Sequence, residues 1–114
     1  MNEKRMFKRS DLNTKVKLQI LTNDRLVENT EFYVDLVDVS GEGIGFISDR
    51  QLLIGECFRG KMTLWTKETL EVIIKIVRSE EAEDAFHYGG IFVGLNDSDA
   101  IRIKIYQLYE ENEV

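Results

Sequence analysis

The chain has 114 residues and a mass of 13.3 kDa, a size that predicts a single domain with one hydrophobic core. Hydrophobic residues make up 43% and charged residues 32%, which is the composition of a globular rather than a disordered protein. The single cysteine, Cys57, excludes an internal disulfide, and with His87 as the single histidine a zinc site is not expected.

The net charge of −6 is unevenly distributed along the chain. Residues 1–17 hold six basic and two acidic side chains, a local charge of +4, so the other 97 residues carry −10. We therefore expect a flexible basic N-terminal arm over 1–14 and an acidic domain over 15–114. No apolar run approaches the roughly 18 residues that a membrane span needs, and no signal-peptide core follows the basic start. These features predict a cytoplasmic protein with no membrane insertion.

Six short strands are predicted by alternating or β-branched apolar residues. The clearest of them has four apolar residues that we expect on one face, Leu70, Val72, Ile74 and Ile76. Glycines follow the second strand at Gly41, Gly43 and Gly45, where the backbone must bend sharply or allow a close approach. Gly89 and Gly90 predict a bulge or a barrel corner in the last strand. The predicted strands lie at 15–20, 31–39, 44–47, 57–65, 70–77 and 86–93, with an acidic turn at 79–85 between the last two.

The last segment changes to a helical period. Asn96 to Asp99 supply N-cap candidates and negative charge for a first turn. One apolar stripe then follows at Ile101, Ile105, Leu108 and Tyr109, and we expect it to cover an open end or face of the sheet. The fold class is therefore all-β, a small six-stranded antiparallel barrel with a C-terminal α-helix.

Two polar clusters are not needed to build this core. The first is Arg5-x-x-x-Arg9 in the basic arm, and the second is Asp38-x-Ser40-x-x-Gly43 at the end of the second strand. Each is weak evidence alone, since basic segments often contain paired arginines and Asp or Ser before glycine usually forms a turn.

In this order and context, the two clusters resemble the motifs of the PilZ family, small barrels that bind cyclic di-GMP. Ile76-Val77-Arg78 and 88–93 are similar to the closing strand pair of that family, so the resemblance covers nearly the whole chain. It implies a non-enzymatic cyclic di-GMP receptor or adaptor that acts through an unidentified effector protein, with motility, adhesion or exopolysaccharide as output. It also implies a cytoplasmic protein with no cofactor beyond its ligand.

The residue chemistry agrees with this ligand. An arginine fork can donate to both N7 and O6 of guanine, and a second arginine can pair with a phosphodiester. Asp38 can accept from guanine N–H groups beside the Ser40 hydroxyl. Glycine leaves room for a flat ligand at Gly43, and Gly41 eases the same turn. The resemblance adds Lys4, as a companion of a stacked ligand pair, and Lys8 could reach a phosphate.

Two other functions remain open. A PilZ-like module could act through protein contacts alone and bind no nucleotide. A barrel could also use its basic arm on single-stranded nucleic acid, but the charge of −10 on the body and few aromatic residues near the arm weigh against it. No constellation of acid, base and nucleophile indicates an enzyme, and Asp97-Ser98-Asp99 is better explained by helix capping than by a metal site.

Overall fold

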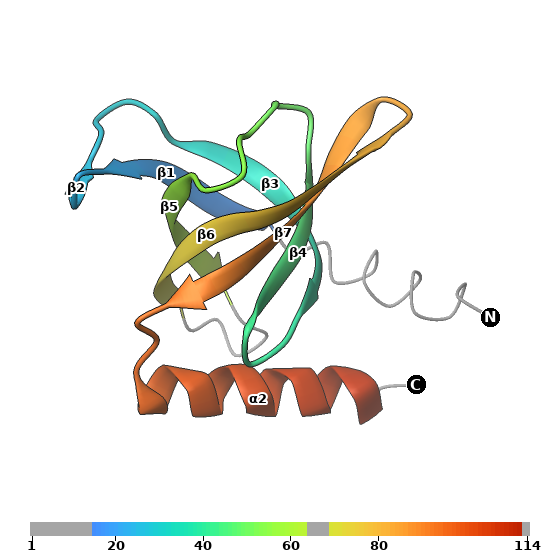
Figure 1. Cartoon of the computed structure of the whole chain (residues 1–114). Coiled ribbons are helices and arrows are strands. Elements are labelled where there is room, and N and C mark those ends of the chain that lie inside the picture. The colour runs from blue at the N-terminus through green and yellow to red at the C-terminus, as the bar shows by residue number, and fades with distance from the viewer. Residues whose placement is uncertain (1–14, 64–68, 113–114) are drawn as a thin grey trace.

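The computed structural model describes residues 15–63 and 69–112, except for the side chains of Ala82 and 106–112. Six of its strands correspond to the predicted ones, and a two-residue strand that was not predicted pairs with the end of the first. The elements in chain order are β1 (Lys15–Thr22), β2 (Arg25–Leu26), β3 (Phe32–Val39), β4 (Gly43–Ser48), β5 (Cys57–Thr63), β6 (Thr69–Ala82), β7 (Ala85–Val93) and the helix α2 (Asp97–Asn112) (Figure 1).

The sheet closes into a barrel. Its strands follow the order β1-β3-β4-β7-β6-β5, and β5 pairs again with β1, so the six longer strands form a ring. All of these pairings are antiparallel. Helix α2 lies across one end of the barrel (Figure 1). The predicted six-stranded antiparallel barrel with a C-terminal helix is therefore confirmed.

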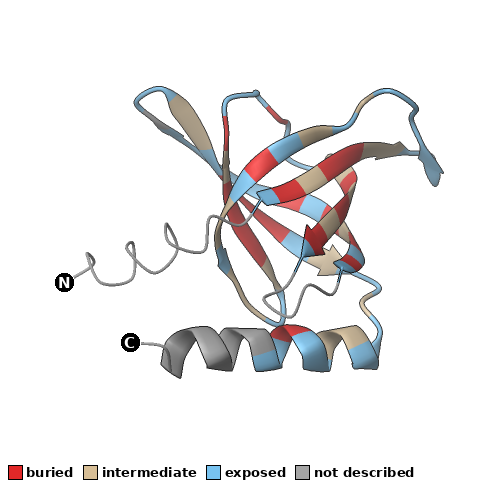
Figure 2. Cartoon of the chain, turned by 180° about the vertical axis from the view of Figure 1, so that it is seen from behind, coloured by how far each residue is buried: buried red, intermediate tan, exposed pale blue. Residues whose placement is uncertain are grey.

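Alternation along the strands builds the core. Inward-facing positions carry aliphatic and aromatic side chains. Buried residues alternate with less buried ones along several strands (Figure 2). The predicted inward face of β6 is confirmed, because all four of its apolar residues are buried. The fully or nearly fully buried set includes Val16, Leu18, Val34, Ile44, Phe46, Phe58, Met62, Leu70, Val72, Ile74, Ile76, Tyr88 and Ile103.

The β6–β7 hairpin contains a bulge and is longer than predicted. Ile76 pairs with Gly90 and Arg78 with Gly89, so Val77 is the extra residue. The predicted irregularity therefore lies in the expected strand pair, but on the strand opposite the two glycines. The predicted turn over 79–85 is wrong in extent, because β6 continues to Ala82 and β7 begins at Ala85. Pairing with β7 outweighs the weak strand propensity of the glutamates.

Helix α2 is capped as predicted but faces the barrel differently. The Asp99 N–H donates to Asn96 Oδ1 at 2.8 Å, which is an N-cap bond. Ile103 is fully buried, whereas Ile101 is 59% exposed and Ile105 is 52% exposed. The predicted stripe is therefore wrong at these two residues, and the side chains of 106–112 lie outside the described set. With isoleucine at 101, 103 and 105, the sequence does not specify which one enters the barrel.

Tyr88 provides a test of how the loop after β4 is held against the barrel core. Its hydroxyl accepts from the Leu52 N–H at 2.6 Å and donates to the Arg50 carbonyl at 3.1 Å, so it fastens the loop after β4 over the core. Tyr88→Phe would leave a buried N–H without its acceptor, and we expect a loss of about 1–3 kcal/mol in the free energy of unfolding, measured with urea. Tyr33→Phe is the control, because Tyr33 is 65% exposed. Equal stability of the two variants would contradict this role.

Candidate ligand-binding site

Four residues form a row across the outer face of the barrel. Asp38 on β3 pairs with Gly45 on β4, Gly45 pairs with Gly89 on β7, and Gly89 pairs with Arg78 on β6. A Cβ placed on Gly45 would lie 2.8 Å from Asp38 Oδ1, and one on Gly89 would lie 2.8 Å from Arg78 Cζ. The carboxylate and the guanidinium therefore lie over neighbouring glycines, and we call these four residues the glycine row.

The floor beside the glycine row depends on a close approach of β4 and β7. A Cβ on Gly43 would lie 2.0 Å from the Gly90 carbonyl oxygen and 2.9 Å from the Ile91 Cα. Only glycine fits between these backbones. The structure thus gives Gly43 a packing role in addition to the predicted one of leaving room for a ligand. Gly41 differs, since a Cβ there would meet no described atom within 4 Å and its φ is not positive.

Ser40 shapes the turn between β3 and β4. Its backbone N–H donates to the Gly43 carbonyl at 2.9 Å, and its hydroxyl oxygen accepts from the Glu42 N–H at 3.2 Å. The hydroxyl lies 3.5 Å from the Gly43 carbonyl, a long contact that leaves its proton available to another acceptor. The Phe92 N–H also donates to the Glu42 carbonyl at 2.9 Å, so the turn is fastened to β7.

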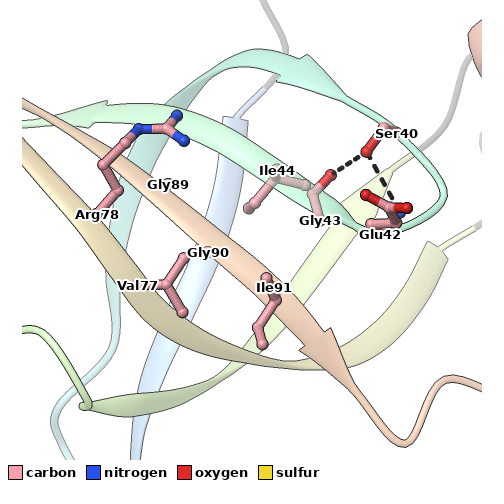
Figure 3. A pocket seen from close by; sticks show the side chains of 9 residues that line it. All are labelled: Ser40, Glu42, Gly43, Ile44, Val77, Arg78, Gly89, Gly90 and Ile91. Atoms are coloured by element: carbon pink, nitrogen blue, oxygen red, sulfur yellow. Dashed lines mark hydrogen bonds between the residues drawn. The ribbon is translucent and has the colours of Figure 1, made fainter.

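A shallow hollow of ≈ 190 Å³ lies between this turn and Arg78 (Figure 3). The glycines of β4 and β7 form its floor, Val77 and Ile91 provide apolar side chains, and Ser40 with Glu42 lies at the opposite end from Arg78 (Figure 3). Val77 and Ile91 are each 42% exposed. The volume is below the roughly 300–1,000 Å³ of a typical small-molecule pocket, so the barrel surface forms one wall of a site rather than a closed cavity.

The predicted site residues of the barrel lie on one side of it. Ser40 and Gly43 line the hollow, and Asp38 belongs to the glycine row beside it. Asp38 is exposed and Ser40 is partly buried, so both remain accessible from outside the core. Gly41 lies in the same turn but does not line the hollow. Lys4, Arg5, Lys8 and Arg9 lie outside the described residues.

The start of β1 lies near this site. Lys15 pairs with Asp35, and β1 and β3 are antiparallel. Asp38 lies three residues further along β3, on the side from which the chain enters the barrel. The Lys15 ammonium group also forms an ion pair with the Asp35 carboxylate at 2.5 Å.

Arg78 is the residue that our sequence reasoning missed. Among the described residues it forms no ion pair, and its guanidinium lies over Gly89 at one end of the hollow. The sequence does contain one hint of this arrangement, since glycines occur in both β4 and β7. Glycines in adjacent strands allow long side chains from neighbouring strands to lie flat above them. The strand register needed to place Arg78 there was absent from the sequence.

The family comparison agrees with this architecture. The model of the PilZ domain matches residues 3–110, so the chain belongs to the PilZ domain family. PilZ domains are receptor or adaptor modules for cyclic di-GMP rather than enzymes. No protein of curated function matches the sequence closely enough to count as a relative.

Solved structures show the same fold at low sequence identity. The inhibitor of motility MotI/DgrA from Bacillus subtilis aligns with a TM-score of 0.73 and 13% identity, over 88% of this chain and 47% of that one. The PilZ domain of YcgR from Escherichia coli, solved with c-di-GMP, aligns with a TM-score of 0.67 and 12% identity, over 88% of this chain and 83% of that one. MrkH from K. pneumonia in its apo state aligns with a TM-score of 0.68 and 13% identity, over 88% of this chain and 47% of that one. This chain thus spans about half the length of MotI/DgrA.

The described part of the chain lacks two features. Residues 15–63 and 69–112 contain no group of three His, Cys, Asp or Glu side chains that could hold a metal ion. The same residues include no helix that is both long and apolar enough to cross a membrane.

Gly43 and Gly41 make a matched pair for testing the close approach of β4 and β7. Gly43→Ala would force β4 and β7 apart, and we expect it to lower the free energy of unfolding by about 1–3 kcal/mol in chemical denaturation. Gly41→Ala adds the same methyl group in open space, and we expect a change within about 0.5 kcal/mol. A stability of Gly43→Ala equal to that of Gly41→Ala would show that the strands do not need this close approach.

Proposed function

We propose that this protein is a cyclic di-GMP receptor whose N-terminal arm folds over the bound nucleotide and alters contact with a partner protein. The observation that carries the proposal is the glycine row, with a carboxylate and a guanidinium at its two ends and the hollow beside it. Family membership and the bound c-di-GMP of the YcgR domain support the same ligand.

The barrel surface matches the chemistry of a guanine nucleotide. The Arg78 guanidinium can donate to O6 and N7 of one base, and the Asp38 carboxylate can accept from the N–H groups on the opposite edge of a base. A floor of glycines lets a flat ring lie close to the backbone. Val77 and Ile91 provide apolar contact, and the Ser40 hydroxyl can donate to a phosphate or ribose oxygen.

The basic arm can supply the remaining contacts. Arg9 precedes Lys15 by six residues, which an extended chain spans over at most about 20 Å. Lys15 pairs with Asp35, which lies three residues before Asp38 on β3. The two arginines of the arm can therefore reach the hollow. Their fork geometry suits phosphate and base edges better than an ammonium would. Lys4 and Lys8 are their neighbours in the sequence and add positive charge for two phosphodiester groups.

Energies indicate that neither half of the site is sufficient alone. Micromolar binding requires about −8 kcal/mol, and each charge-assisted hydrogen bond contributes about 1.5–3 kcal/mol. Ordering a flexible segment costs about 2–5 kcal/mol. Two arginines of the arm would barely offset that cost, so contacts from Asp38, Ser40 and Arg78 are needed as well. Binding energy then drives the change in the arm, and no covalent step is involved.

The arm in its closed position would present a new surface to an effector protein. We place the output in motility or biofilm control, since MotI/DgrA, which shares the fold, is an inhibitor of motility. A cytoplasmic location follows from the intracellular nature of this second messenger. The competing function is a module that works through protein contacts and binds no nucleotide.

Calorimetric titration with cyclic di-GMP, with GTP as the control ligand, tests the proposal. We expect micromolar or tighter binding of cyclic di-GMP alone, and Arg9→Ala to weaken it at least tenfold through loss of a charged contact. Arg25→Ala is the matched control, because Arg25 is exposed on β2 at the opposite end of β1. Wild-type heats for Arg9→Ala would contradict the role of the arm, and no heat at all would favour the module that binds no nucleotide.

Arg78 gives a second, independent test of the same site. Arg78→Gln removes the charged fork and keeps a polar side chain, so we expect about tenfold weaker cyclic di-GMP binding with unchanged thermal stability. Lys75→Gln is the control on the same strand, since Lys75 is exposed and does not line the hollow. Equal affinities for these two variants would remove Arg78 from the site.

A further inference from the structure

The far half of β6 has an open edge. From Thr69 to Lys75 this strand pairs with β5. Ile76 forms backbone hydrogen bonds with the loop that precedes β5, to Gly55 at 2.8 Å and to Glu56 at 2.9 Å. Beyond Ile76, β6 continues to Ala82, and no strand among the described residues pairs with its outer side. This part of the β6–β7 hairpin projects beyond the barrel (Figure 1). We call residues 77–82 the β6 edge.

Main-chain groups along the β6 edge are directed outward at alternate residues. The hairpin closes with Ala82 paired to Ala85, so the backbone groups of Ala82 face β7. Because the direction of these groups alternates from one residue to the next, the N–H and C=O groups of Glu81 and Ser79 face away from β7. Such a row of strand donors and acceptors is a template for an added strand.

The side chains around the β6 edge carry strong negative charge. Glu80, Glu81, Glu83 and Asp84 are all exposed, and Arg78 is the one basic residue between 77 and 84. None of the four carboxylates takes part in an ion pair within the described part of the chain. The charge thus favours a cationic occupant and disfavours an anionic one.

The inner end of the β6 edge is apolar. Leu53 is 64% exposed and Ile54 is 65% exposed, in the loop that bonds to Ile76 through Gly55. Val77, the first residue of the edge, is 42% exposed. An added strand would therefore meet aliphatic side chains at one end and carboxylates at the other.

We infer that the β6 edge receives an extended segment of a partner protein as an added β-strand, with lysine or arginine opposite Glu80 and Glu81 and aliphatic residues beside Leu53 and Ile54. A second copy of this chain fits less well, because antiparallel pairing of two such edges would bring glutamates together. Val77 and Arg78 also line the hollow, so a bound strand and a bound ligand would influence each other. The inference itself does not depend on nucleotide binding.

The competing explanation is that the glutamates only protect an exposed edge from aggregation. It predicts that no strand binds. A capped hexapeptide with two adjacent lysines at one end and valines at the other is a direct probe, with the same peptide carrying glutamates in place of the lysines as the control. Binding to the whole chain is followed by NMR at low ionic strength, together with amide hydrogen exchange.

We expect the lysine peptide to bind, to slow exchange of the Ser79 and Glu81 amides, and to bind at least fivefold more weakly to Glu81→Lys. Glu28→Lys is the charge-matched control, since Glu28 is exposed in the β2–β3 loop. Ser79→Pro removes an edge donor and should abolish binding, whereas Ser79→Ala keeps the donor and should not. Absence of binding, equal binding of the glutamate peptide, or protection at 36–39 on β3 instead would overturn the inference.

Discussion

The close approach of β4 and β7 is the constraint on which the barrel and the candidate site both depend. Gly43 has room for no side chain, because a Cβ would overlap the Gly90 carbonyl oxygen. Gly45 and Gly89 face each other in the same strand pair and leave the outer surface flat. Asp38 and Arg78 lie down onto this surface from the two neighbouring strands. The packing that closes the sheet thus also leaves a flat surface at the candidate site.

The bulge at Val77 connects this floor to the rest of the molecule. The extra residue changes the register of β6, so that Ile76 stays in the core while Arg78 lies on the outer face over Gly89. Beyond the same point β6 no longer has β5 as a neighbour, and no other described strand pairs with its outer edge. One local irregularity therefore positions a site residue and begins the projecting hairpin, which places the two proposed binding surfaces side by side.

The sequence predicted strands well where apolar and polar residues alternated strongly. It did not predict the buried face of the helix, where several isoleucines were equally suitable. The inward face of β6 was predicted because four β-branched or aliphatic residues recur at every second position. Helix α2 was predicted with N-cap candidates from Asn96 to Asp99, and Asn96 is the one that caps it. Its predicted apolar stripe was wrong, however, because Ile101 and Ile105 are exposed and Ile103 is buried. The packing of α2 against the end of the barrel decides this choice, and no local sequence pattern reports it. The acidic run after Arg78 resembled a turn because its pairing partner was not visible in the sequence.

The sequence by itself determined the fold class, the polar motif from Asp38 to Gly43 and the uneven charge of the chain, because these follow from residue type and short-range spacing. Only the tertiary structure decided three features: Arg78 lies on the same outer face as Asp38, Gly43 is required for strand packing, and the end of β6 has no partner on its outer side among the described strands. These three features depend on register between strands that are distant in the chain. Register is set by the closure of the whole barrel, and a single strand contains no information on its neighbour.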